Sequence, residues 1–199
     1  MKPNPGPKQA SMKLSPEQLR RNGVALDMVS RRMPAQRPGQ SRQDYATPDA
    51  LIEAVKRRFD VRKFSYDLAA SPENAKARHF FTEEEDSLGQ DWLTLLPGDY
   101  WLNPPFSRID LWAQKCAGWL SACVRKRTTR GRIFFLTPAS IGSSWFIAHI
   151  HNVACVYALR GRLSFDGIGP YPKDCILSVY DSSTYPKVGF DVWDWRRWC

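Results

Sequence analysis

The residues best suited to chemistry in this chain are Asn103-Pro104-Pro105-Phe106, directly after the largely apolar run 99–102. Proline lacks a backbone N–H and fixes φ, so a strand must end here and the chain must form a stiff, extended corner. The side-chain oxygen of Asn103 and the carbonyl oxygen of Pro104 are two acceptors, and Phe106 adds a flat apolar face. The corner is therefore suited to hold a planar ring that bears an exocyclic amino group.

Two acceptors on such an amino group also change its reactivity. The nitrogen lone pair is delocalised into the ring, which makes the amine a poor nucleophile. Hydrogen bonds to both of its hydrogens favour a more pyramidal nitrogen whose lone pair can attack an electrophile. No strong base is required before attack, which fits a neutral Asn103 and indicates transfer of an electrophilic group to the amine.

This tetrapeptide and several other segments, in the same order, resemble the phage-type DNA N6-adenine methyltransferases. The segments are 46–48, 64–70, 86–88 with Trp92, 103–106, 136–139 with 145–146, and 161–165. The resemblance implies methyl transfer from S-adenosylmethionine to N6 of an adenine flipped out of double-stranded DNA. It implies that Asn103 and Pro104 hold the amine, Pro105 stiffens the corner and Phe106 stacks on the base. The role implied is modification of phage or prophage DNA.

The resemblance also indicates where the cofactor binds. The run 64–68 predicts a strand that ends at Asp67 and is followed by the small residues Ala69 and Ala70. In an open parallel α/β sheet, ligands bind beyond the carboxyl ends of the strands. We expect Asp67 to bind the α-amino group of the cofactor, and Ala69 to let the cofactor approach the backbone. The Gly-x-Gly of most methyltransferases is missing here, and the resembled family has an Asp-x-Ala-Ala form.

A second acidic position follows in the run 83–86. Asp86 lies 19 residues beyond Asp67, and an acid about 20 residues past the first strand commonly accepts hydrogen bonds from ribose hydroxyls. We expect Asp86 to bind the nucleoside end of the cofactor, with Glu85 as the alternative. The rest of the run is interpreted as a solvated surface.

A helix start lies before these elements. Thr47 suits the N-cap and Pro48 the first helical position, and apolar residues then recur on one helical face. In the resembled family this Thr-Pro pair lies beside the methionine end of the cofactor, so Thr47 and Pro48 are predicted cofactor contacts.

Two groups of cations are predicted to contact DNA phosphates. Arg108 stands in the first turn of the helix predicted after the corner, where the helix dipole disfavours a cation. A second group stands ahead of the apolar strand predicted at 133–136, and it consists of Arg125, Lys126, Arg127 and Arg130. Such contacts would position a duplex without reading its sequence. The alternative is a solvated loop.

Charge is distributed unevenly along the 199 residues, whose net charge is +9. Residues 1–43 hold nine Lys or Arg and two Asp or Glu, a net of +7, whereas the remainder holds twenty and eighteen, a net of +2. We therefore expect a basic, largely disordered arm over 1–43, with a short helix near Ser15, and one methyltransferase domain over 44–199. Such an arm suits a polyanion, and a solvated tail is the alternative.

The order of elements predicts an α/β fold, a Rossmann-like methyltransferase with a mostly parallel sheet and an antiparallel edge. Ser107 and Asp110 resemble a capping pair, and Ser143 or Ser144 is predicted to cap a short helix. Runs 154–159 and 163–165 are interpreted as paired strands, and 175–180 as a further strand. The aromatic, basic segment 192–199 could stack on bases or cover the core, and the sequence leaves this open.

Several classes of protein are disfavoured by what the sequence lacks. Its five cysteines form no CxxC pair and no zinc spacing, so we expect free thiols in a reducing compartment and no metal. No apolar run approaches the ~18 residues of a membrane span, and the start is no signal peptide, so a cytoplasmic protein is expected. The oligomeric state is left open.

Two alternatives to DNA methylation remain. The amine chemistry of the Asn-Pro-Pro-aromatic corner also serves enzymes that methylate an RNA base or a protein glutamine amide. The missing glycines are compatible with a degenerate module that binds DNA without catalysis. Uptake of S-adenosylmethionine distinguishes the last case.

Overall fold

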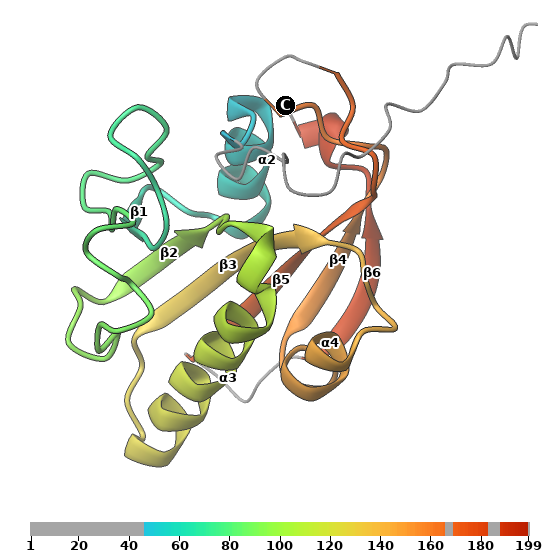
Figure 1. Cartoon of the computed structure of the whole chain (residues 1–199). Helices are drawn as coiled ribbons and strands as arrows, with labels where there is room; N and C mark the ends of the chain where they lie inside the picture. Colours follow the sequence, from blue (N-terminus) through green and yellow to red (C-terminus); the bar gives the residue numbers. More distant parts are fainter. Residues whose placement is uncertain (1–45, 166–168, 183–187, 199) are drawn as a thin grey trace, which may run out of the picture. The chain divides into compact units, whose positions relative to one another are not determined.

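A computed structural model of the chain describes residues 46–165, 169–182 and 188–198. These residues form one six-stranded sheet in the order β1-β2-β3-β5-β4-β6, with helices on both faces (Figure 1). The elements are α2 (Asp49–Phe59), β1 (Phe64–Asp67), β2 (Gly98–Leu102), the 3₁₀-helix η1 (Phe106–Arg108), α3 (Ile109–Lys126), β3 (Gly131–Pro138), α4 (Ser144–His149), β4 (Cys155–Leu159), β5 (Cys175–Asp181), β6 (Gly189–Trp193) and the 3₁₀-helix η2 (Trp195–Trp198). The arm predicted over 1–43, and its short helix, lie outside the described residues.

The sheet is mostly parallel, as predicted for an α/β domain of Rossmann-like type. Strands β1, β2 and β3 are parallel neighbours, and β4 is parallel to β6. Strand β5 runs antiparallel to both β3 and β4 and lies between them. The predicted antiparallel edge is therefore wrong, because the reversed strand lies inside the sheet and a parallel strand, β6, forms the edge.

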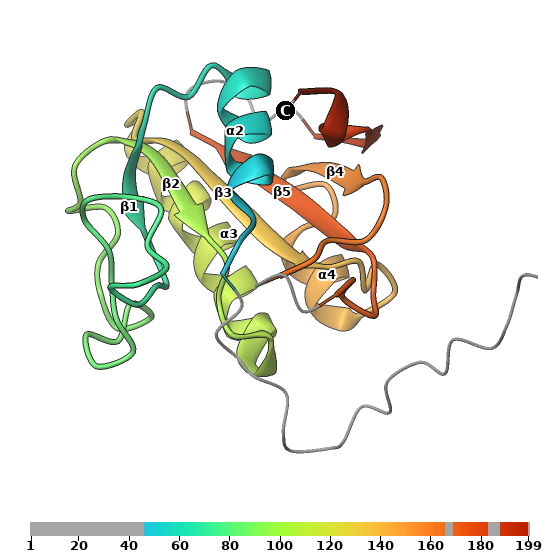
Figure 2. The same ribbon diagram turned by 90° about the horizontal axis from the view of Figure 1, so that it is seen from above.

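Alternating side chains of the strands build two apolar layers. On one side, residues such as Tyr100, Leu102 and Phe135 pack against α3 and α4. On the other, Trp101 and Phe134 belong to a second cluster that includes the apolar face of α2. Figure 1 shows α2 and η2 above the sheet and α3 and α4 below it, and in Figure 2, seen from above, α3 runs behind the strands. Both faces are covered, which explains why β3 reads as a continuous apolar run.

The strand order reverses at β1. After β1 the chain returns along its outer side, where Ala77 forms a parallel bridge with Phe64 and Phe80 forms one with Asp67. The N–H of Asp67 donates to the carbonyl of His79 over 2.9 Å, and the N–H of Phe81 donates to the carbonyl of Asp67 over 3.0 Å. The chain then crosses to the other side of β1 and forms β2. Such a reversal opens a crevice at the carboxyl ends of the two strands, where ligands bind in open α/β sheets.

Helix starts differ in part from the predictions. Pro48, not Thr47, occupies the N-cap of α2, because its ψ of 132° is extended and its carbonyl accepts from Ile52 N–H; the predicted Thr47 cap is wrong. Helix α3 begins one turn after the corner with Arg108 in the N-cap and no side-chain cap, so the predicted capping pair is wrong. The predicted Ser143 cap is confirmed, since its Oγ accepts from Phe146 N–H over 3.4 Å.

The C-terminal third contains one wrong pairing. Strand β4 pairs with β5 and β6, not with residues 163–165, so the predicted local hairpin is wrong. The predicted strand at 175–180 is confirmed as β5. Trp193 and Trp195 are buried in the layer beneath α2. These two side chains of the aromatic segment therefore cover the core.

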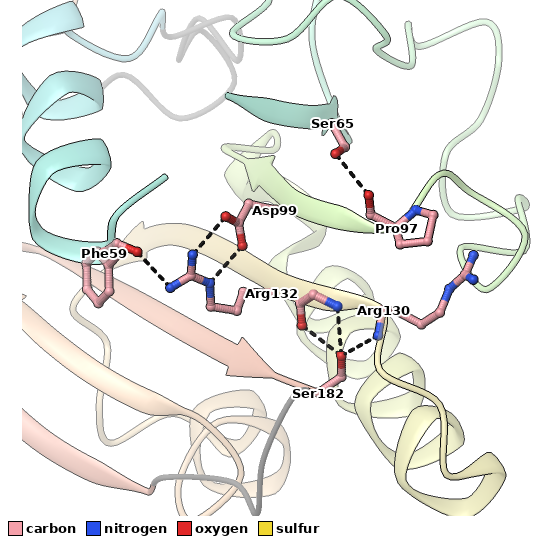
Figure 3. A network of polar contacts seen from close by, with 8 residues as sticks. Phe59, Ser65, Pro97, Asp99, Arg130, Arg132 and Ser182 are labelled. Carbon is pink, nitrogen blue, oxygen red and sulfur yellow. Dashed lines mark hydrogen bonds and ion pairs between the residues drawn. The ribbon is translucent and has the colours of Figure 1, made fainter. Parts of the chain in front are cut away.

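A polar network fixes the amino ends of the strands (Figure 3). Arg132 binds both carboxylate oxygens of Asp99, over 2.7 and 2.8 Å, and also donates to the carbonyl of Phe59 over 2.9 Å. The Oγ of Ser182 accepts from the N–H groups of Arg130 and Gly131 at 2.9 Å each. This network links α2, β2, β3 and the end of β5 at the edge opposite the Asn-Pro-Pro-Phe corner.

Two glycines allow the backbones of β2 and β3 to approach closely at the same edge. Gly98 and Gly131 begin β2 and β3 and are registered partners, with φ of +146° and +113°. A Cβ on Gly131 would lie 1.9 Å from the carbonyl oxygen of Gly98. Only glycine fits that position, because the obstacle is backbone.

Candidate active site

The Asn-Pro-Pro-Phe corner lies at the carboxyl end of β2, as predicted. Strand β2 ends at Leu102, and a 3₁₀ turn begins at Phe106. Pro104 is buried, and Asn103 and Phe106 are half-buried. The side-chain oxygen of Asn103 is itself buried. The corner is thus held by packing yet is not sealed beneath the core.

Asp67 ends β1, and Asn103 directly follows its parallel neighbour β2. Asp67 is the registered partner of Trp101, and Asn103 comes two residues after Trp101, just past the end of the strand. The side chain of Trp101 lies on the face that α2 covers. The structure therefore brings together the two site residues that the sequence predicted from separate strands, at the reversal of strand order.

The carboxyl group of Asp67 is deeply buried, with 2 % of the residue exposed. Its Oδ1 accepts from Ala69 N–H over 3.3 Å and its Oδ2 from Lys76 N–H over 2.9 Å. Burial raises the pKa of Asp67 to about 7, and the two backbone donors and the nearby Lys76 charge only partly oppose that effect. A cationic ligand beside this carboxylate would favour its ionised form.

Thr47 and Pro48 lie at the same edge, ahead of α2. Thr47 is buried, and Asp49 in the first turn of α2 forms a 2.7 Å ion pair with Lys76, whose N–H binds Asp67. The start of α2 is thereby linked to the end of β1. The predicted cofactor residues Thr47, Pro48, Asp67 and Ala69 thus come from two linked segments.

An aromatic cluster lies beside the corner. The rings of Phe106 and Tyr171 meet edge to face at 5.8 Å, and Tyr171 meets Phe165 in the same way at 5.5 Å. Tyr171 is held by its N–H, which donates to the carbonyl of Leu163 over 2.6 Å. Tyr171 was not predicted as a site residue. It lies between two prolines, more than 60 residues from Phe106 along the chain, and no local pattern indicates their contact.

Asp86 and Glu85 follow the segment that runs beside β1. Their carboxylates differ in whether they accept hydrogen bonds from the protein. Glu85 Oε2 accepts from the N–H and the hydroxyl of Thr82, over 2.8 and 3.0 Å. Asp86 is exposed, with φ of +42°. Its carboxylate has no hydrogen-bond partner within the described part of the chain. Asp86 is thus the more available of the two for a ligand.

Arg108 is exposed at the start of α3, directly after the corner. It lines a hollow of about 440 Å³ that continues along α3 past Lys115 and Trp119. Lys115 is engaged there, since its Nζ donates to the carbonyls of Leu88 and Gln90 over 3.0 and 2.7 Å. Asn103 is not among the lining residues, so this hollow is a neighbour of the corner and not the corner itself.

The second predicted DNA contact lies elsewhere. Arg125 and Lys126 end α3, and Arg127 is its left-handed C-cap. Arg130 donates to the carbonyl of Leu95 and precedes β3. The whole group stands at the amino ends of β2 and β3, and the five steps from Gly98 to Asn103 correspond to about 17 Å. The structure does not bring these cations to the corner, and three of them complement the helix dipole.

The described residues give three further structural findings. Within residues 46–165, 169–182 and 188–198, no three His, Cys, Asp or Glu side chains gather as metal ligands would. No helix in the same part of the chain is both long and apolar enough to cross a bilayer. Cys116, Cys123, Cys155 and Cys175 are free thiols.

Comparison with known proteins gives a family and two relatives. Residues 35–177 match the family model described as DNA N-6-adenine-methyltransferase (Dam). The chain is 28% identical over 129 residues to a DNA N-6-adenine-methyltransferase of Escherichia phage T1, which covers 65% of this chain and 50% of that protein. It is 36% identical over 123 residues to a protein of the same name from Haemophilus phage HP1, which covers 61% and 65%. The matches thus span about half to two-thirds of these relatives.

Proposed function

Because this chain belongs to the DNA N-6-adenine-methyltransferase family, we propose that it transfers a methyl group from S-adenosylmethionine to N6 of adenine in double-stranded DNA. The observation that carries the proposal is the placement of Asp67 and Asn103 at the carboxyl ends of two adjacent parallel strands, where the chain path reverses. That edge is where an open α/β sheet binds its ligand. The phage relatives support a role in phage or prophage DNA modification in the host cytoplasm.

The residues at this edge fit S-adenosylmethionine. Asp67 offers a buried carboxylate to an ammonium group, and Ala69, a small, partly buried residue, would let the cofactor approach the backbone. Thr47 and Pro48 precede Asp49, whose ion pair with Lys76 links the start of α2 to Asp67. Asp86 offers an exposed carboxylate to ribose hydroxyls. S-adenosylmethionine, when bound, supplies an electrophilic methyl group on a sulfonium centre.

The corner residues act on the adenine. The Asn103 side-chain oxygen and the Pro104 carbonyl accept the two N6 hydrogens, which readies the nitrogen lone pair for attack. Phe106 stacks on the base, and Tyr171 supports the ring of Phe106 from its edge. The adenine must leave the duplex to reach them, and fixing its amine in one geometry supplies much of the rate.

Arg108 is the cation best placed to contact DNA in this reaction. It follows the corner directly and is exposed, so a phosphate next to the flipped adenine lies within its reach. The remaining predicted contacts, Arg125 to Arg130, would have to bind a more distant part of the duplex.

The test is to incubate the protein with labelled S-adenosylmethionine and duplex DNA and to analyse the nucleosides for N6-methyladenine. Replacing Asn103 by Ala is expected to lower the rate by about 10²-fold or more, the usual effect of losing one such hydrogen-bonding partner, while cofactor affinity changes little. Asn103→Asp keeps an acceptor oxygen and is expected to retain more activity than Asn103→Ala. Full activity in Asn103→Ala would contradict the mechanism.

Parallel reactions with RNA and with protein test the alternatives. Methylated RNA or methylated glutamine in place of N6-methyladenine would mean that the substrate is RNA or protein and not DNA. A protein that binds DNA but takes up no S-adenosylmethionine would be a non-catalytic module.

A further inference from the structure

A second hollow, of about 470 Å³, opens at the amino end of β1 and is strongly cationic. Four of its ten lining residues are Lys or Arg, one is His, and none is Asp or Glu. These five residues are Lys56, Lys63, Lys76, Arg78 and His79. They come from α2, from the residue before β1 and from the segment that runs beside β1.

Two of these cations have acidic partners, and two have none. Lys56 pairs with Glu53 at 2.9 Å and Lys76 pairs with Asp49 at 2.7 Å. Both acidic side chains are mostly exposed, 52% and 89%, so water screens their charge. Lys63 and Arg78 are exposed and form no ion pair within the described residues. The hollow therefore keeps a surplus of positive charge.

The wall of the hollow is fixed in place. Ala77 forms a parallel bridge with Phe64, and the carbonyl of His79 accepts from Asp67 N–H over 2.9 Å. The His79 ring stacks on Tyr66 at 5.3 Å. Leu96, which is 57% exposed, adds an apolar rim. A rigid cationic hollow with an apolar rim matches the alternation of phosphate and sugar along a nucleic acid strand.

The hollow shares an edge of the domain with the basic group at the end of α3 (Arg125, Lys126, Arg127 and Arg130). Arg130 donates to the carbonyl of Leu95, the residue before Leu96, and Gly98 pairs with Gly131 at the start of the two strands. The five steps of β2 separate this edge from Asn103 by about 17 Å. Lys76 and His79 in the wall also bond to Asp67 through their backbones, whereas Lys63 and Leu96 precede β1 and β2 at the amino edge. A ligand bound at that edge is therefore not the adenine held at the corner.

We propose that this hollow binds the phosphodiester backbone of a nucleic acid at a site separate from the one that holds the adenine, with Lys63 and Arg78 as its principal contacts. The identification of that nucleic acid as DNA rests on the proposed function. Such a site adds sequence-independent affinity and contacts a part of the nucleic acid remote from the reacting base.

The test is equilibrium binding of the full chain to a duplex of G·C pairs only, as a function of salt. This duplex contains no adenine, so its binding reads the backbone contact whether or not the chain methylates adenine. Lys63→Gln with Arg78→Gln is expected to reduce the slope of log K against log salt by up to about 2, since each phosphate contact adds about 0.9. At about 0.15 M salt the affinity should fall roughly tenfold or more.

Arg62→Gln is the matched control, because Arg62 is exposed, adjacent to Lys63 and absent from the hollow. It is expected to leave the slope within a few tenths of the original. Equal slopes for the double variant and the control would overturn the proposal. Competition by millimolar inorganic phosphate that abolishes duplex binding would also overturn it, in favour of a site for free phosphate. Insensitivity to that phosphate supports the backbone site.

Discussion

The backbone N–H of Lys76 donates a 2.9 Å hydrogen bond to Oδ2 of Asp67, and the ammonium group of the same lysine pairs with Asp49. One residue thus joins the end of β1 to the start of α2. The carboxyl group at the centre of this arrangement is buried, and its ionisation is consequently coupled both to folding and to whatever binds beside it.

The pH dependence of stability should reveal this burial. The pKa of Asp67 is raised from 3.8 to about 7 in the folded protein, so the folded state holds a proton that the unfolded state has lost between these values. The contribution is fully present below pH 3.8 and is lost as pH rises to about 7, by roughly 4 kcal/mol at 1.36 kcal/mol per pKa unit. Urea unfolding at pH 4 and pH 8 measures it. In Asp67→Asn the same comparison should lack this loss, and an identical loss would assign it to other groups.

Affinity for the cofactor should also depend on the ionisation of Asp67, but it should rise with pH where stability falls. An ammonium group prefers the ionised carboxylate, so affinity for S-adenosylmethionine is expected to rise by up to about tenfold per pH unit below pH 7. Calorimetric titration in two buffers with different protonation enthalpies should detect the released proton. Asp67→Asn should bind weakly and without this rise. A flat profile in the original protein would place the cofactor away from Asp67.

A substitution at Gly131 tests the close approach of two strands. In Gly131→Ala the new Cβ would lie 1.9 Å from the Gly98 carbonyl oxygen at a φ of +113°, so unfolding free energy should fall by about 3 kcal/mol or more. Gly118→Ala is the control, because Gly118 lies in α3 with no atom within 4 Å of its Cβ position. That variant should be more stable by up to about 1 kcal/mol. Thermal or urea unfolding distinguishes the two signs.

The two ion pairs of different exposure should differ in energy. Asp99→Ala leaves Arg132 without its bidentate partner in a pair whose side chains are 16% and 23% exposed, and about 2 kcal/mol of stability should be lost. Glu53→Ala removes an exposed partner of Lys56, and less than about 1 kcal/mol should be lost. Equal effects on urea unfolding would mean that the Asp99 pair is no more desolvated than the surface pair.

The basic loop can be tested without disturbing the fold. Replacing Arg125, Lys126 and Arg127 by Gln leaves Arg130, whose guanidinium binds the Leu95 carbonyl, in place. If the loop contacts phosphates, DNA affinity falls and the salt slope drops by about 0.9 per lost contact. An unchanged slope would mean that these three cations contact no phosphate and are solvated, with only the dipole of α3 as a favourable partner.

Features set by short stretches of sequence could be predicted. Strand β2 ends just before the prolines at 104 and 105. The apolar run at 133–136 lies in β3, and Ser143 caps α4. Asp67 ends β1 and Asn103 directly follows β2, and parallel strands end at one edge. That edge and its two principal residues therefore followed from local patterns and one general rule.

Features set by pairing between distant segments of the chain could not be predicted. Strand β4 has partners in β5 and β6 that outweigh the nearby residues 163–165, and no local pattern reveals that competition. The position of β5 inside the sheet, the contact of Tyr171 with Phe106 and the amino-edge location of Arg130 have the same origin. Thr47 failed as a cap because the carbonyl of Pro48 takes the first helical bonds.

The burial of Trp193 and Trp195 against α2 has a consequence for synthesis on the ribosome. The first described helix cannot complete its apolar contacts until these two tryptophans have been translated, and β4 lacks both partners until β5 and β6 follow. Closure of the domain thus depends on contacts that span well over a hundred residues, which slows folding. Part of the apolar face of α2 therefore stays uncovered in the nascent chain after β2 and β3 have been made, and a chaperone could bind it in that interval.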